Sequence, residues 1–122
     1  MSNWINIEVN KRTRPARVVV TLSKAIRFNS SSIKDFKWQK VKYIKLIAKK
    51  EPDKNIIGFI PFETKEDSAL TFSPSKSGGA FISGNSLFTA LNIDPTKLKE
   101  RKFKPHSEKY EEKDILVIEI PK

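Results

Sequence analysis

The chain has 122 residues, of which 38% are hydrophobic, and this suits one domain with a core of its own. It has no cysteine, which excludes disulfides and thiolate metal sites, and no apolar run long enough to cross a bilayer. The net charge of +10 lies entirely in residues 1–61, with 14 basic and 4 acidic side chains against 10 of each in residues 62–122.

This uneven distribution of charge predicts a basic face and therefore a polyanionic partner. The alternative is a solvated surface rich in lysine, with no partner. The first residues show no basic region followed by an apolar stretch, so no signal peptide is expected. Together with the absence of cysteine, this favours a cytoplasmic location.

Strands dominate the elements expected in the first half. Residues 4–10 alternate between apolar and polar side chains, as a half-buried strand does. Pro15 ends a basic segment that breaks this pattern, and residues 16–22 form a second strand rich in valine. Residues 41–62 contain two apolar stretches around a turn cluster, which predicts a β-hairpin.

Two short helices are expected, one in each half. Asn29 to Ser32 provide good N-caps for a helix that reaches about Trp38, after a short extended piece at residues 26–28. Ser83 is the expected N-cap of the second helix, at residues 84–92. Further strands are expected at residues 69–72, 80–82, 102–104 and 115–120.

The two halves repeat the same order of elements. Residues 26–33 align with residues 80–87 at an offset of 54, and the match lies in the order of apolar, cap and apolar positions. We therefore expect a single domain, residues 1–122, with pseudo-repeats at about residues 16–62 and 69–120. The predicted fold is mostly β with two short helices, as a small barrel built by internal duplication.

Residues 16–62 resemble a known family. The apolar runs at 18–22, 26–28, 41–44 and 56–61, with Ile33 and Phe36 between them, resemble the AbrB/MazE swapped-hairpin pattern. In that pattern, a strand leads to a short extended segment, a small helix and a hairpin. With a second copy, the resemblance implies a single-chain barrel of the double-psi or cradle-loop type, and it implies DNA binding, as in regulators and antitoxins.

The residues that could support catalysis do not form a recognisable motif. His106 is the only histidine, lies in a charged stretch and is expected in an exposed loop without the partners that a metal site requires. The serines are placed as caps and loop residues. The glycine-rich loop at residues 75–79 lacks the order of a nucleotide P-loop. The sequence therefore predicts a protein that is not an enzyme and uses no cofactor or metal.

Basic clusters in the first half are the candidate binding residues. One cluster lies near residue 12, and a second surrounds two aromatic residues, of which Trp38 could stack on a base or belong to the core rim. The predicted nucleic-acid-binding residues are Lys11, Arg12, Arg14, Arg17, Lys24, Arg27, Lys37, Trp38, Lys40 and Lys42.

These residues support the hypothesis of a non-enzymatic nucleic-acid-binding protein, a regulator or accessory factor for which DNA is favoured over RNA. Two alternatives stay open. One is a protein-interaction module or small inhibitor, of the phage or mobile-element type, that docks on a nucleic-acid enzyme. The other is a binder of single strands. A complete internal repeat would suit a monomer, whereas a single swapped hairpin would need a homodimer.

Overall fold

The computed structural model describes residue 4, residues 15–76 and residues 78–122. The two α-helices are α1 (Ser30–Asp35) and α2 (Asn85–Leu91), and a 3-10 turn, η1 (Pro95–Lys97), follows α2. The strands are β1 (Val18–Val20), β2 (Ala25–Phe28), β3 (Tyr43–Lys50), β4 (Lys54–Phe62), β5 (Leu70–Thr71), β6 (Ser73–Pro74), β7 (Ala80–Ser83), β8 (Lys102–Phe103), β9 (His106–Tyr110) and β10 (Lys113–Pro121).

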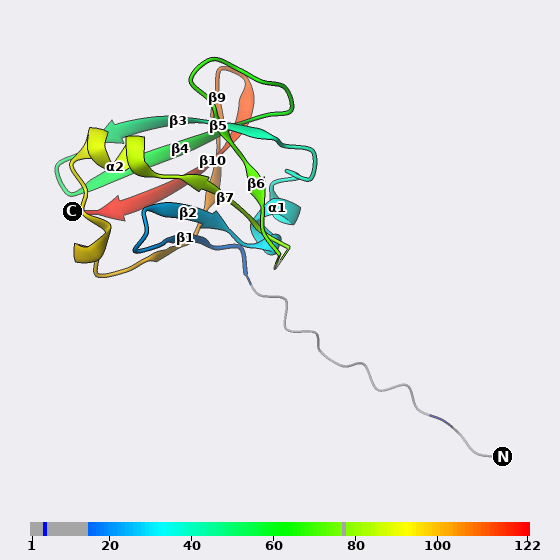
Figure 1. The fold of residues 1–122 in the computed structure, drawn as a ribbon, viewed down its shortest axis with the longest axis horizontal. Coiled ribbons are helices and arrows are strands. Elements are labelled where there is room, and N and C mark those ends of the chain that lie inside the picture. The colour runs from blue at the N-terminus through cyan, green and yellow to red at the C-terminus, as the bar shows by residue number, and fades with distance from the viewer. Residues whose placement is uncertain (1–3, 5–14, 77) are drawn as a thin grey trace.

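The strands form two antiparallel sheets, in two layers (Figure 1). Sheet A has the order β6-β7-β2-β1-β8, and sheet B has the order β5-β3-β4-β10-β9. The fold is thus mostly β with two short helices, as expected, but neither sheet closes into a barrel. The edge strands β6 and β8 of sheet A are two residues long, and Pro74 lacks the amide hydrogen that a further partner would need.

The main core fills the space between the two sheets. Val18 and Ile26 from sheet A and Ile44 and Leu116 from sheet B are fully buried in it. Phe28 lies at its centre, with its ring 5.1 Å from that of Phe59 in an edge-to-face arrangement. Burial of these apolar side chains is the main favourable term in the folding of such a domain.

Asn29 joins β2 to α1. Its Oδ1 atom accepts hydrogen bonds from the backbone N–H groups of Ser32 (2.9 Å) and Arg17 (3.1 Å). Its Nδ2 atom donates to the Pro15 carbonyl at 2.9 Å. The N-cap expected from the polar run after Phe28 is therefore confirmed, and it also fixes the corner where the chain enters β1.

The predicted hairpin is confirmed by the pairing of β3 with β4 from Tyr43↔Phe62 to Lys50↔Asn55. Three local predictions were wrong. The second helix has Gly84 as its N-cap, one residue after the expected Ser83. His106 belongs to β9, not to a loop, because the segment pairs with the long strand β10. The last strand, expected at residues 115–120, runs from Lys113 to Pro121, and Pro121 still pairs with Lys54 at the start of β4.

Corresponding elements of the two halves meet at the centre of each sheet. In sheet A, β2 pairs with β7, and in sheet B, β4 pairs with β10. Outside these pairs, β1 and β6 flank the centre of sheet A, while β3 and β9 flank the centre of sheet B. Each half therefore contributes strands to both sheets. The internal duplication itself stays a prediction, as does the expected strand at residues 4–10, most of which lies outside the described residues.

Candidate nucleic-acid interface

The pairing registers of sheet A place five side chains in one line across its outer face. Arg27 on β2 is opposite Phe81 on β7 and Val19 on β1, while Lys102 on β8 is opposite Val19. Ser73 on β6 is opposite Phe81 and ends the line. Paired residues of neighbouring strands point to the same face of a sheet. We call these five residues the sheet A row.

The neighbours of the row along each strand point inward. Val18, Ile26, Phe28, Ile82 and Phe103 are all buried in the core. Period-2 alternation therefore turns the row toward solvent. Its aromatic ring, Phe81, is 36% exposed, which is high for a large apolar side chain on a sheet.

The row is positively charged and carries no acid. In the five strands of sheet A, all within the described part of the chain, no residue is Asp or Glu. Arg27 and Lys102 are exposed, and within the described residues neither is within ion-pair distance of a carboxylate. A cation beside an aromatic ring, with a second cation further along the same face, can hold phosphates while the ring contacts a base.

Two predicted residues lie at opposite ends of the β1–β2 hairpin. Arg17 precedes β1 and is half-buried, and its Nη1 atom donates to the Ala16 carbonyl at 2.8 Å. Lys24 lies in the turn between the strands, exposed and with a positive φ of 65°. Together with Arg27, they are the predicted binding residues that belong to sheet A.

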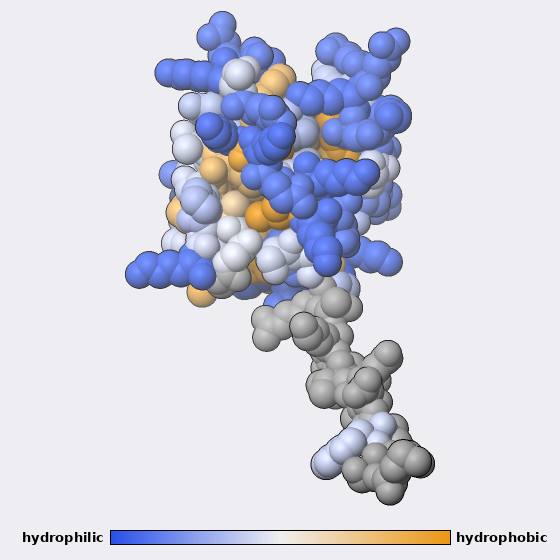
Figure 2. All heavy atoms as spheres, turned by 90° about the vertical axis from the view of Figure 1, so that its right-hand side faces the viewer, coloured by the Kyte–Doolittle hydropathy of each residue, from blue (hydrophilic) through white to orange (hydrophobic). Residues whose placement is uncertain are grey.

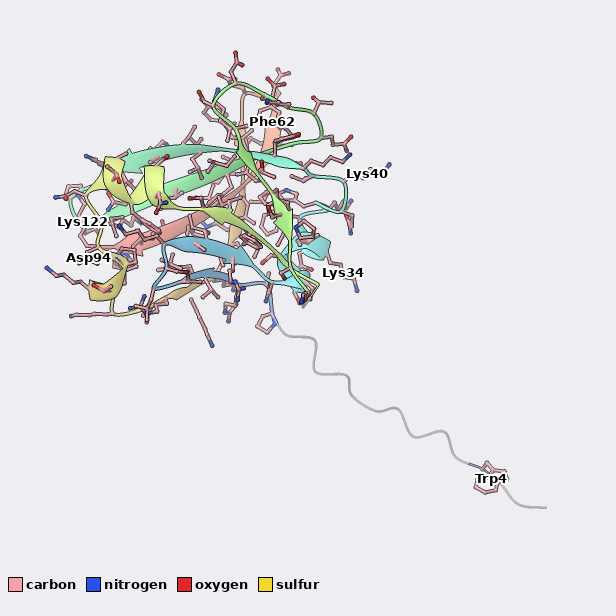
Figure 3. The ribbon with its side chains drawn as sticks, viewed as in Figure 1. Trp4, Lys34, Lys40, Phe62, Asp94 and Lys122 are labelled. Atoms are coloured by element: carbon pink, nitrogen blue, oxygen red, sulfur yellow. The ribbon has the colours of Figure 1, made fainter. Side chains whose placement is uncertain are left out.

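Three other predicted residues lie on a different part of the surface, between α1 and β3. Lys37, Lys40 and Lys42 are all exposed there. Figure 3 shows Lys40 and the neighbouring Lys34 projecting from the end of the molecule that contains α1. Seen from that side, the surface is mostly hydrophilic with small apolar areas between the side chains (Figure 2). The structure thus divides the predicted residues between a sheet face and a lysine-rich end.

Lys11, Arg12 and Arg14 lie outside the described residues. The described chain resumes at Pro15, which is bonded to Asn29 at the start of α1. Pro15 and Arg17 both bond to Asn29, so the described chain begins at the corner between sheet A and α1.

Trp38 is a core residue, which corrects its assignment to the binding surface. Its side chain is 3% exposed, and its ring lies 5.5 Å from Phe28 and 5.6 Å from Phe72. A buried ring has no free face for a base. The position follows α1, where the chain turns inward, and the Trp38 amide donates to the Ile33 carbonyl at 2.8 Å.

Phe81 and Lys102 were missed by the sequence analysis. Phe81 stands between Ala80 and Ile82, which face the core, and Lys102 precedes Phe103, which also faces the core. Alternation within these short strands was the available signal, because a middle residue must face away from its neighbours. The predicted binding residues were all chosen from residues 1–61, where the net positive charge lies, so neither Phe81 nor Lys102 was among them.

The glycine-rich loop between β6 and β7 serves packing. A Cβ atom added at Gly79 would lie 2.2 Å from the carbonyl oxygen of Phe28, so only glycine fits against β2 there. The Gly79 carbonyl accepts a hydrogen bond from the Ser75 amide at 2.8 Å, which closes the loop on itself. The loop geometry is thus explained without an anion.

Two other kinds of site were sought among the described residues. No cluster of three His, Asp or Glu side chains there could hold a metal ion. The His106 Nε2 and Glu108 Oε2 atoms lie 3.4 Å apart on the exposed strand β9. None of the helices in the described ranges is both long and apolar enough to span a membrane.

Comparisons of the chain with protein families, curated proteins and solved structures gave no match.

Proposed function

We propose that this protein binds nucleic acid through the outer face of sheet A. The observation that carries the proposal is the row itself, in which an exposed phenylalanine lies beside Arg27 on a sheet face whose strands carry two cations and no acids. Arg27 and Lys102 would contact phosphates, and Phe81 would contact a base or sugar. Arg17 and Lys24 would extend the contact along the β1–β2 hairpin.

We further propose DNA as the polymer and a regulatory or accessory role without catalysis. The support is the resemblance of residues 16–62 to the AbrB/MazE pattern, whose members are often DNA-binding regulators. Lys11, Arg12 and Arg14 precede Arg17 in the sequence and would add contacts to the same strand of DNA.

Substitution of Phe81 can distinguish binding of single-stranded DNA from binding of duplex DNA. Stacking on an aromatic ring requires a base with a free face, which a duplex does not offer. Replacing Phe81 with alanine should weaken single-strand binding by about 1–3 kcal/mol if the ring stacks on a base. The same variant should bind duplex DNA almost as the parent does if the face recognises duplex phosphates.

The function is tested with two variants of equal charge change. Arg27→Ala/Lys102→Ala removes both cations of the row, whereas Lys45→Ala/Lys49→Ala removes two exposed cations from β3 in sheet B. Fluorescence anisotropy with labelled duplex DNA, single-stranded DNA and RNA at low salt would compare them. We expect the first variant to lose at least about tenfold in affinity and the control to change little.

Equal losses in the two variants would show that only total charge matters and would reject sheet A as the interface. No measurable binding of the parent protein to any of the three polymers at low salt would reject the function.

Strand β9 supports a second candidate function, docking on a protein. All five of its residues are exposed, and within the described part of the chain it pairs only with β10, so its other edge is open. An open edge can accept an extended peptide as a further strand. Capture of one defined protein that survives nuclease treatment and protects β9 amides from hydrogen exchange would favour this alternative.

A further inference from the structure

A cavity among the described residues lies at one end of the two sheets, lined by the core-facing side of β8 and not by the sheet A row. Its volume is about 870 Å³, within the range of small-molecule sites. The inner side of β8 and the ends of β4 and β10 form its floor, and the segment from the end of α2 to residue 100 forms the opposite wall. Figure 3 shows Asp94 and Lys122 at this end.

The body of the cavity is apolar. Phe103 contributes a buried aromatic ring, and Ile120 contributes a buried branched chain. Leu91, Ile93 and Leu98 line the other side and are half-buried against the core. Such walls favour a flat or hydrophobic group over a fully hydrated ion.

One polar side chain in the floor lacks a partner. Asn55 lines the cavity and is 5% exposed, and its Oδ1 atom is buried without a hydrogen bond. An unpaired buried acceptor is costly, so the site gains when a ligand supplies an N–H or O–H donor. The terminal torsion of asparagine is soft, so a small rotation can turn this oxygen toward such a donor.

Lysines surround the cavity. Lys97, Lys99 and Lys122 line it and are exposed, and none forms an ion pair within the described residues. Asp94 also lines it, but its Oδ1 atom accepts hydrogen bonds from the Thr96 amide (3.0 Å) and hydroxyl (2.7 Å). Asp94 Oδ1 therefore caps the N-terminus of η1, whereas the three lysines have no ion-pair partner and can bind an anion.

We propose that this cavity binds a nucleoside monophosphate. The base is planar and would lie against the half-buried Leu91, Ile93 and Leu98, one of its N–H groups would donate to Asn55, and the phosphate would lie near Lys97 and Lys99. Inorganic phosphate would leave the apolar walls uncovered, and a fatty acid has no N–H donor for Asn55. The site is separate from the sheet A row, so the proposal does not depend on nucleic-acid binding there.

Isothermal titration calorimetry with AMP, CMP, GMP and UMP tests the proposal, with inorganic phosphate and laurate as comparison ligands. We expect at least one nucleotide to bind with a Kd below about 1 mM and more tightly than either comparison ligand. Asn55→Leu removes the acceptor at similar size and should weaken binding at least about tenfold. Lys97→Ala/Lys99→Ala changes only exposed side chains, so it should fold normally, and it should weaken binding similarly.

Lys45→Ala/Lys49→Ala and Arg27→Ala/Lys102→Ala serve as controls and should bind the nucleotide as the parent does. Circular dichroism would confirm that each variant is folded. If Asn55→Leu does not fold, the lysine pair alone decides the outcome. Failure of all four nucleotides to bind, equal binding by phosphate, binding of laurate alone or unchanged binding by the lysine pair variant would overturn the proposal.

Discussion

Trp38 shows at the scale of one residue how burial decides a role. Lysines at positions 37, 40 and 42 surround it in the sequence, yet its ring packs against Phe28, Phe36 and Phe72. Trp38→Ala should therefore lower the free energy of unfolding by about 3–5 kcal/mol. Urea denaturation would measure this, with Trp38→Phe as a milder control. A fully stable Trp38→Ala variant would contradict the packing.

The Lys54–Glu119 pair predicts a pH dependence. Its atoms are 2.8 Å apart across β4 and β10. The hydrogen bond to Glu119 raises the pKa of Lys54, and the hydrogen bond from Lys54 lowers the pKa of Glu119. Because the Glu119 pKa is lowered in the folded state, the ion pair stabilises the fold at pH values above the unfolded-state pKa of about 4.5. This stabilisation is lost as the pH falls further. Because the Lys54 pKa is raised in the folded state, the ion pair also stabilises the fold at pH values below 10.5. This stabilisation is lost at higher pH.

Glu119→Gln should consequently have a slightly lower free energy of unfolding than the parent at pH 7, and this difference should become smaller toward pH 3. The loss is small because both side chains are partly in solvent, where screening weakens an ion pair. Urea midpoints of the parent and the variant at the two pH values would show it. A difference in urea midpoint that becomes larger at acidic pH would contradict a stabilising Lys54–Glu119 ion pair.

At the scale of elements, the predictable parts were those with long apolar patterns. The hairpin β3–β4 and the last strand β10 have enough alternating or continuous apolar residues to be recognised, and the polar run at Asn29 marks the start of α1. Strand β9 was missed because all its side chains are exposed, so its sequence has no hydrophobic pattern. Only its pairing with β10 makes it a strand, and pairing depends on the tertiary structure.

The loop between β6 and β7 carries an element-scale prediction. Gly79 lies against the backbone of Phe28, which cannot move without disturbing β2. Gly79→Ala should therefore cost about 1–3 kcal/mol of stability through overpacking. Gly78→Ala is the comparison variant: its nearest neighbour is 3.7 Å away, so its cost comes from the φ of 90°, which strains any side chain, and not from overpacking. Thermal unfolding that ranks Gly78→Ala as the more harmful would contradict this account.

At the scale of the whole molecule, charge that is separated along the chain is mixed in space. The basic first half was expected to form the contact surface alone, but the sheet A row takes Phe81 and Lys102 from the second half. The reason is that each sheet contains strands of both halves, with β1 and β2 of the first half between β7 and β8 of the second in sheet A. The sequence could therefore predict a basic partner surface and Arg27 within it, but not the residues beside Arg27.

The salt dependence of binding is the matching prediction for the whole surface. Each phosphate contact contributes about −0.9 to the slope of log K against log salt on duplex DNA. Arg27→Ala/Lys102→Ala should make that slope shallower by about two, whereas Phe81→Ala should leave it unchanged. Anisotropy titrations between low and physiological salt would measure both. An unchanged slope in the double variant would place the phosphate contacts elsewhere.

The central pairs β2–β7 and β4–β10 also determine how the chain can be divided. A cut in the exposed segment 63–68 would leave each fragment with inner strands that lack a neighbour. We expect neither fragment to be stable alone, and the two to associate when co-expressed, as fragment complementation. Co-purification through a tag on one fragment would show this. The covalent link between the halves would then be dispensable, whereas the strand pairs between them would not.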